Sequence, residues 1–230
     1  GLFELREAIA KYHSKKNKYP YTADNIIVGP GSKELIFQTQ LIMNGDLLLP
    51  YPSWVSYEPQ ANIINKKIHW LKTTAKTNWH LNPQTLNQLC YKIKNITKLL
   101  ILNSPNNPSG TIHGDLKSLA NVAKKHDVII IADEIYAELD FRGEYKSLTH
   151  YYPEGTIISS GLSKWCGAGG WRLGTFIFPN ELDHIRKTLR SIASETFTAV
   201  SAPIQYAAIK AYKEDYSDYL NLSRKILNCI

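Results

Sequence analysis

The segment from Ser159 to Gly174 is the part of this sequence best suited to covalent chemistry. Its centre is Lys164, which follows a short apolar run and has small or aromatic neighbours, and Arg172 stands eight residues later. In such surroundings an amine acts as a nucleophile toward a carbonyl carbon, and an arginine binds phosphate through two parallel hydrogen bonds. A single lysine is more often a surface charge, so the prediction of a lysine-based site depends on the residues that accompany it.

Polar residues also follow three other apolar runs. Ser32 and Lys33 come after a glycine turn, Asn107 stands in a cluster of turn residues, and Asp133 is followed by Tyr136. Ligands of open α/β sheets bind at the carboxyl ends of the strands, so these side chains are candidates for one site. Each also has a plain structural interpretation as a cap, a turn residue or a core side chain.

The glycine turn at residues 29–34 reads G-P-G-S-K-E. It lacks the last glycine of the dinucleotide-binding pattern, and the sequence contains no P-loop pattern. A helix that begins at this turn still presents free backbone N–H groups and the positive end of its dipole, which suit a phosphate. The alternative is an ordinary turn between a strand and a helix.

Short apolar runs alternate with helical patterns along the chain, and this order must position the candidate residues. Strands are expected at residues 26–28, 46–49, 68–71, 99–102, 128–132, 156–159 and 173–178. Helices are expected at residues 2–13, 55–62, 83–94, 116–125, 182–194 and 203–216, with a further helix capped by Ser32. The alternation predicts an α/β protein, a three-layer αβα fold with a mainly parallel mixed sheet.

The composition is that of a folded protein. Of 230 residues, 43% are apolar and 20% are charged, which excludes collagenous, low-complexity and wholly disordered chains. Apolar runs fall short of the about 18 residues of a membrane span, and residues 1–18 lack a signal peptide's apolar segment. Three cysteines without C-x-x-C spacing predict neither a disulfide framework nor a metal site. We therefore expect a soluble cytoplasmic protein with no membrane partner.

The net charge of +7 is unevenly distributed. From Pro59 to Gly114 there is no Asp or Glu, and this stretch carries Lys66, Lys67, Lys72, Lys76, Lys92, Lys94 and Lys98. Such a surface would suit nucleic acid or another polyanion. Because lysine dominates over arginine and no recognition motif accompanies the charge, we favour a solvated lysine-rich face and expect no nucleic-acid partner.

Several separated motifs, in one order along the chain, resemble those of the class I and II aminotransferases, which bind pyridoxal 5'-phosphate (PLP) in the fold type I architecture. The motifs are Ser163-Lys164 with G-W-R-L-G, D-E-I-Y at residues 133–136, N-P-S-G at 107–110, P-S-W-V-S-Y at 52–57, G-S-K at 31–33 and L-F-E-L-R-E-A-I-A at 2–10. In that order they resemble the family's cofactor-lysine signature, D-x-x-Y, N-P-[TS]-G, ring-stacking segment, phosphate cup and N-terminal helix motif. The resemblance covers nearly the whole chain and implies the large PLP-binding domain of that fold.

The resemblance implies three catalytic residues. Lys164 would hold the cofactor aldehyde as a Schiff base and then move the proton of the substrate α-carbon. Asp133 would keep the pyridine nitrogen protonated, so that the ring withdraws electrons from that carbon. Tyr136, together with Asn107, would bind the phenolic oxygen of the cofactor and thereby make the lysine easier to exchange.

The resemblance also implies how the rest of the cofactor is held. Arg172 would bind the phosphate as a bidentate fork, and the segment of Gly31, Ser32 and Lys33 would add backbone N–H groups at a helix start, while Trp54 would stack on the ring. Many members carry a serine three residues before the lysine, where this chain has Gly161. With that departure, either Ser160 or Ser163 substitutes for the family's serine or this one phosphate contact is missing.

By resemblance, the protein is an aminotransferase that transfers the amino group of an L-amino acid to a 2-oxo acid and works as a homodimer. Carbon–sulfur lyases and decarboxylases of the same fold share these motifs, and a PLP-binding domain without catalysis of its own is a further alternative. We expect residues 1–202 to form the PLP-binding large domain and residues 203–230 to lead as helix toward a C-terminal small domain that the sequence lacks. In this family that small domain carries the arginine for the substrate carboxylate, so the sequence does not identify the amino acid.

Overall fold

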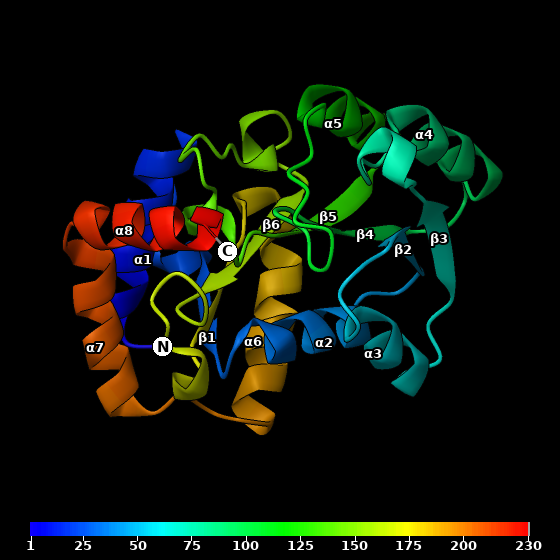
Figure 1. Cartoon of the computed structure of the whole chain (residues 1–230). Coiled ribbons are helices and arrows are strands. Elements are labelled where there is room, and N and C mark those ends of the chain that lie inside the picture. Colours follow the sequence, from blue (N-terminus) through cyan, green and yellow to red (C-terminus); the bar gives the residue numbers. More distant parts are fainter. Residues whose placement is uncertain (230) are drawn as a thin grey trace.

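The computed structural model describes residues 1–229 and is built around a seven-stranded sheet in the order β1-β7-β6-β5-β4-β2-β3 (Figure 1). The strands are β1 (Ile26–Gly29), β2 (Asp46–Tyr51), β3 (Ile68–Lys72), β4 (Lys98–Asn103), β5 (Val128–Asp133), β6 (Thr156–Gly161) and β7 (Gly174–Ile177). Strands β3, β2, β4, β5 and β6 run parallel to one another, whereas β7 is antiparallel to both β6 and β1. The predicted mixed and mainly parallel sheet is confirmed.

Helices cover both faces of this sheet. They are α1 (Phe3–Asn17), α2 (Ser32–Ile42), α3 (Tyr57–Ile63), α4 (Pro83–Lys92), α5 (Leu116–Lys125), α6 (Asp183–Glu195), α7 (Ala202–Lys213) and α8 (Ser217–Cys229). One core lies between the sheet and α2, α3 and α6, and the opposite face packs on α4 and α5 in one core and on α1 and α7 in another. The three-layer αβα architecture is therefore confirmed.

Alternation along the strands explains why both faces of the sheet are covered. Leu47 and Leu49 point into the core below α2 and α3, whereas Leu48 between them points to α4. Because successive side chains of a strand face opposite sides, a continuous apolar run such as β4 is buried on both faces. These runs were the sequence signal for the strands.

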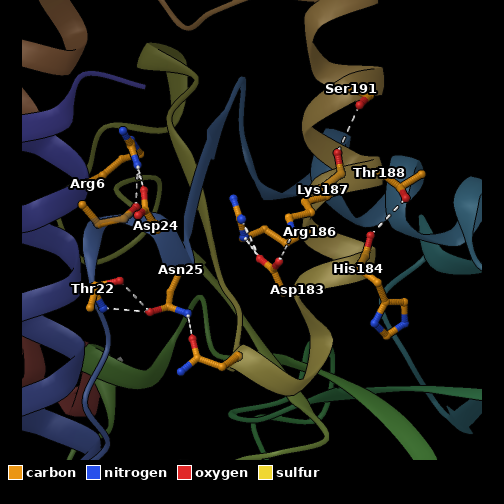
Figure 2. Close-up of polar contacts among 12 residues, drawn as sticks. Arg6, Thr22, Asp24, Asn25, Asp183, His184, Arg186, Lys187, Thr188 and Ser191 are labelled. Atoms are coloured by element: carbon orange, nitrogen blue, oxygen red, sulfur yellow. Dashed lines mark hydrogen bonds and ion pairs between the residues drawn. The ribbon is translucent and has the colours of Figure 1, made fainter.

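Polar contacts at the strand β1 end of the sheet fix the segment that leads into the site. Arg6 of α1 pairs with Asp24, and the Asn25 side-chain amide donates to the Asn180 side-chain oxygen at 2.8 Å (Figure 2). On α6, Asp183 pairs with both Arg186 and Lys187 (Figure 2). The first two contacts join the segment that precedes β1 to α1 and to the segment before α6, and the ion pairs of Asp183 lie within the first turns of α6.

Two local predictions differ from the structure. Ser32 is the first residue of α2 rather than its cap, and Gly31 with φ +93° takes the cap position. The helix expected at residues 203–216 ends at Lys213, and a separate helix, α8, begins at Ser217. The carboxylate of Asp215 accepts the N–H of Ser217 at 2.9 Å, so this acidic residue supports a new helix start that the periodicity alone did not indicate.

The C-terminal helices differ in how they join the fold. Helix α7 packs along α1 and contributes Ala208 and Tyr212 to the core, whereas none of the residues of α8 is buried. Residue 230, the last of the predicted exit segment, lies outside the described residues. The division into residues 1–202 and 203–230 stays a prediction.

Two of the seven lysines between Pro59 and Gly114 serve the fold. The ammonium group of Lys66 donates to the carbonyls of Met43 and Gly45, and that of Lys98 donates to the carbonyl of Ile96. Lys98 is also buried. Both groups satisfy backbone oxygens, which weakens the interpretation of this stretch as one continuous cationic surface. Over residues 1–229, no helix is long and apolar enough to cross a membrane.

Candidate active site

A cavity of about 510 Å³ opens at the carboxyl ends of the central strands and gathers the residues singled out from the sequence. Nine of the ten predicted site residues line it: Ser32, Lys33, Trp54, Asn107, Asp133, Tyr136, Ser163, Lys164 and Arg172. The remaining one, Gly31, is not a lining residue, but its lack of a side chain leaves room for the Arg172 guanidinium, which lines the cavity. Segments more than 130 residues apart in the sequence thus meet at one edge of the sheet, as expected for an open α/β fold.

Asp133 ends the central strand β5 and is almost completely buried. The Tyr57 hydroxyl donates to its Oδ2 at 2.6 Å, and the Ser159 hydroxyl donates to its Oδ1 at 3.2 Å. Burial raises the pKa of this carboxyl group, and the two hydroxyl donors together with the Ile135 N–H oppose that rise. A carboxylate held in this way is prepared to accept a hydrogen bond from a cationic N–H group of a ligand in the cavity.

Lys164, Tyr136 and Asn107 face one another across the cavity. The Lys164 Nζ atom lies 5.5 Å from the centre of the Tyr136 ring, and the Asn107 Nδ2 atom donates to the Tyr136 hydroxyl at 3.4 Å. Asn103 sets this arrangement, because its Oδ1 accepts the N–H of Asn107 at 2.7 Å while its Nδ2 donates to the Asp133 carbonyl at 2.8 Å. Asn103 thereby joins the end of β4 both to the end of β5 and to the loop that carries Asn107.

Arg172 and the start of α2 form an anion-binding corner. The Arg172 guanidinium donates to the carbonyls of Gly169 at 2.7 Å and Pro30 at 3.3 Å, which leaves other N–H groups for a ligand. A Cβ atom at Gly31 would lie 2.1 Å from the Arg172 Nη2 atom, and one at Gly174 would lie 2.1 Å from the Ser32 nitrogen. Both glycines are therefore required for the guanidinium and the helix N-terminus to come together.

The positions of Ser160 and Ser163 distinguish between these two candidates for the phosphate contact that Gly161 cannot make. Ser163 lines the cavity, and Ser160 is not among the lining residues. A Cβ at Gly161 would lie 2.6 Å from the Leu173 carbonyl oxygen, so strand β6 could accept no serine there without moving β7. Ser163 is thus the hydroxyl available to a ligand in the corner formed by Arg172.

Trp54 supplies the aromatic wall. Its ring meets the Tyr57 ring edge-on with centroids 5.3 Å apart, and the Lys33 ammonium lies 5.0 Å from its centre. Lys33 therefore contributes both a backbone N–H at the start of α2 and an exposed side-chain cation at the cavity wall.

Three contributors escaped the prediction from sequence. Tyr57 and Ser159 bind the carboxylate of Asp133, and Asn103 orients the Asn107 loop. Tyr57 lies in the P-S-W-V-S-Y segment. Asn103 directly follows the apolar run of β4, so a search for polar residues at strand ends would have identified Asn103. Ser159 opens the segment around Lys164, but its contact with Asp133 could not be predicted because it depends on β6 lying beside β5.

The residues present fit PLP. The cavity offers an amine, a buried carboxylate, two donors near the amine, an aromatic wall and an anion corner that a Cβ at Gly31 would fill. These are the partners required by an aldehyde, a pyridine nitrogen, a phenolic oxygen, a ring face and a phosphate group. Across residues 1–229 no group of three or more His, Cys, Asp or Glu side chains is placed to hold a metal ion.

Comparison with known proteins places this site in context. The family profile described as "Aminotransferase class I and II" matches residues 1–228. An aspartate aminotransferase of Bacillus subtilis is 31% identical over 221 residues, which is 92% of this chain and 55% of that protein. An asparagine–oxo-acid transaminase of Streptococcus mutans is also 31% identical, over 92% of this chain and 54% of that protein.

Solved structures show the same fold. An aspartate aminotransferase of Thermus thermophilus with maleate superimposes with a TM-score of 0.91 at 28% identity, covering 100% of this chain and 60% of that one. An alanine aminotransferase of Pyrococcus furiosus gives a TM-score of 0.90 at 30% identity, with 99% and 59% covered. The chain thus spans little more than half the length of the curated relatives it matches.

Proposed function

Since this chain belongs to the class I and II aminotransferase family, we propose that the protein is a PLP-dependent aminotransferase that transfers the amino group of an L-amino acid to a 2-oxo acid. The observation that carries the proposal is the single cavity shared by Lys164, the buried Asp133 carboxylate and the anion corner at Arg172. When bound, PLP supplies an aldehyde that takes up amines and a ring that withdraws electrons from the substrate α-carbon.

Binding of the cofactor is assigned to groups on opposite walls. Arg172, the backbone N–H groups of Ser32 and Lys33, and the Ser163 hydroxyl would hold the phosphate, where the positive end of α2 adds to the attraction. Trp54 would cover one face of the ring. The carboxylate of Asp133 would accept the ring N–H and keep that nitrogen protonated.

Proton movement is assigned to Lys164. Its Nζ atom would first be the amine that bonds to the aldehyde carbon, and once released by the substrate it would take the proton from the α-carbon and return it at the next step. Tyr136 and Asn107 would donate to the ring oxygen, which stabilises its negative charge and eases release of the lysine. Two neighbour relations support these roles: Lys164 faces the Tyr136 ring, and Asn107 bonds to the Tyr136 hydroxyl.

For the substrate we infer an acidic amino acid such as L-aspartate. The Lys33 ammonium lies 5.0 Å from the centre of the Trp54 ring at the cavity wall and would supply a cation for a second carboxylate. Several relatives are named for aspartate, and a structural neighbour is described with maleate, a dicarboxylate. These names concern the substrates of the relatives and support the same class of substrate here. In this chain, Lys33 is the residue on which the inference of an acidic substrate rests.

The quaternary structure and location are proposed with the function. We propose a homodimer, as the resemblance implies, and Trp171, which is half-exposed, is one apolar side chain that a partner subunit could cover. The three cysteines are free, in keeping with a reducing cytoplasm. Light scattering of the purified protein gives the mass, and a monomer at all concentrations would contradict the dimer.

The function is tested by mixing the PLP-loaded protein with single L-amino acids and measuring both loss of the aldehyde absorbance and the product. We expect L-aspartate to yield its 2-oxo acid in an amount equal to the aldehyde consumed, with no reaction in Lys164→Ala. Release of carbon dioxide or of a thiol would instead support a decarboxylase or a carbon–sulfur lyase. PLP binding without reaction with any amino acid would support a cofactor-binding domain without catalysis.

A further inference from the structure

The turn that carries Tyr136 is unusually well anchored outside the cavity. After β5 the Ala137 N–H donates to the Glu134 carbonyl at 2.9 Å, and a 3-10 helix, η3 (Ala137–Leu139), follows, with the Leu139 N–H donating to the Tyr136 carbonyl at 2.9 Å. Tyr136 and Glu138 therefore belong to one tight turn. Tyr136 lines the cavity, whereas Glu138 contacts α1.

The Glu138 carboxylate is the centre of a partly buried charge cluster. Its Oε1 accepts the Tyr12 hydroxyl at 2.5 Å and forms an ion pair with Lys16, both on α1. Burial alone would raise the pKa of Glu138, but Lys16 and Tyr12 outweigh it, and the pKa lies below its usual range. The neighbouring His13 is neutral, since burial lowers its pKa to about 3. Glu138 thus stays ionised and bound to α1.

Helix α8 is attached to the same turn. The Arg224 Nε atom donates to the Glu138 carbonyl at 2.9 Å. No described residue of α8 is buried, and this bond is a polar contact that ties α8 to the turn. Through Glu138, the turn is held at its side chain by α1 and at its backbone by α8.

We propose that Glu138 is a positioning residue for Tyr136 and that it couples the placement of α8 to the cofactor site. The Tyr136 hydroxyl has one side-chain hydrogen bond in the cavity, the 3.4 Å contact with Asn107, which is long for such a bond. The position and direction of the Tyr136 hydroxyl are therefore set mainly by the turn that carries Tyr136. The inference rests on the proposed function, because that direction matters only where the hydroxyl meets the cofactor oxygen.

The test replaces Glu138 and follows the bound cofactor by its absorbance as a function of pH. In Glu138→Gln the side chain keeps its size and loses its ion pair, so Tyr136 should donate less well to the cofactor oxygen. The negative form of that oxygen is then less stable, and the titration midpoint should rise by about half a pH unit or more. PLP affinity, measured by fluorescence titration, should fall several-fold.

A double-mutant comparison separates positioning from mere stability. Tyr136→Phe should raise the midpoint further than Glu138→Gln, and in the Tyr136→Phe background Glu138→Gln should add no further rise, because the two act through one hydroxyl. Tyr12→Phe and Arg224→Ala should give smaller rises in the same direction. They serve as second variants if Glu138→Gln does not fold.

The matched control is Asp183→Asn, which removes a carboxylate paired with Arg186 and Lys187 on α6, outside the cavity lining (Figure 2). It should leave the midpoint unchanged. A Glu138→Gln protein that titrates like the wild type, or that shifts the midpoint equally in the Tyr136→Phe background, overturns the inference while PLP binding and the proposed function stand. A wild-type protein that binds no PLP at Lys164 overturns the proposed function itself.

Discussion

Replacing Tyr57 with phenylalanine removes a single hydroxyl from the buried surroundings of Asp133 and keeps the ring that packs against Trp54. The hydroxyl donates to Oδ2 at 2.6 Å, and both side chains are almost completely buried. A hydrogen bond to a charged group contributes about 1.5–3 kcal/mol. Binding of a protonated ring nitrogen requires the ionised carboxylate, so we expect the PLP affinity of Tyr57→Phe to fall about tenfold to a hundredfold at neutral pH.

The pH dependence of this loss follows from the pKa of Asp133. Burial already raises that pKa, and losing the Tyr57 donor raises it further. As the pH falls, Asp133 becomes neutral earlier in Tyr57→Phe than in the wild type, so the affinity gap should widen as the pH is lowered and narrow as it is raised. Fluorescence titration of PLP at a series of pH values measures this gap.

Ser159→Ala is the matched comparison, because its hydroxyl donates to the other carboxylate oxygen over a longer 3.2 Å. It should show the same pH trend with a smaller loss of affinity. If Tyr57→Phe binds PLP as the wild type does at every pH, while thermal unfolding shows that it is folded, the argument that hydroxyl donors hold the charge of Asp133 is wrong.

The remaining predictions concern the anion corner and a second buried carboxyl. Gly31→Ala places a Cβ 2.1 Å from the Arg172 Nη2 atom and should reduce PLP affinity at least about tenfold, whereas Gly110→Ala, with φ +70° and open space around it, should cost only about 1–2 kcal/mol of stability. Arg172→Lys should also weaken PLP binding, by about tenfold, because an ammonium group cannot form the bidentate fork. Burial raises the pKa of Glu134 to about 7, so its contribution to stability is present below its ordinary pKa and is lost as the pH rises through 7. Urea unfolding between pH 5 and 8 should therefore show the wild type losing up to about 3 kcal/mol relative to Glu134→Gln, and parallel curves would contradict this.

The sheet and most of the cavity were predictable because the signals are local. Each buried strand is a continuous apolar run, and the polar residue after it marks the edge where ligands bind, as with Asp133 after β5. Asn107 and Lys164 follow strands in the same way, so strand order brings them together even though they are far apart in the sequence.

The support around those residues depends on tertiary placement and was not predictable. Ser159 reaches Asp133 only because β6 pairs with β5, and Tyr57 reaches it from the start of α3. Ser32 was expected as a helix cap, but the space needed by the Arg172 guanidinium places Gly31 there instead. Helix α8 was missed as a separate element because its start depends on the local bond between Asp215 and Ser217.

The central claim is that Lys164 is the amine that bonds to PLP. The most direct measurement incubates the protein with PLP, reduces it with borohydride and locates the modified lysine by peptide mass spectrometry. The account predicts stoichiometric label on Lys164 and its loss in Lys164→Ala. Label spread over surface lysines such as Lys67 and Lys72, and unchanged in Lys164→Ala, would contradict it.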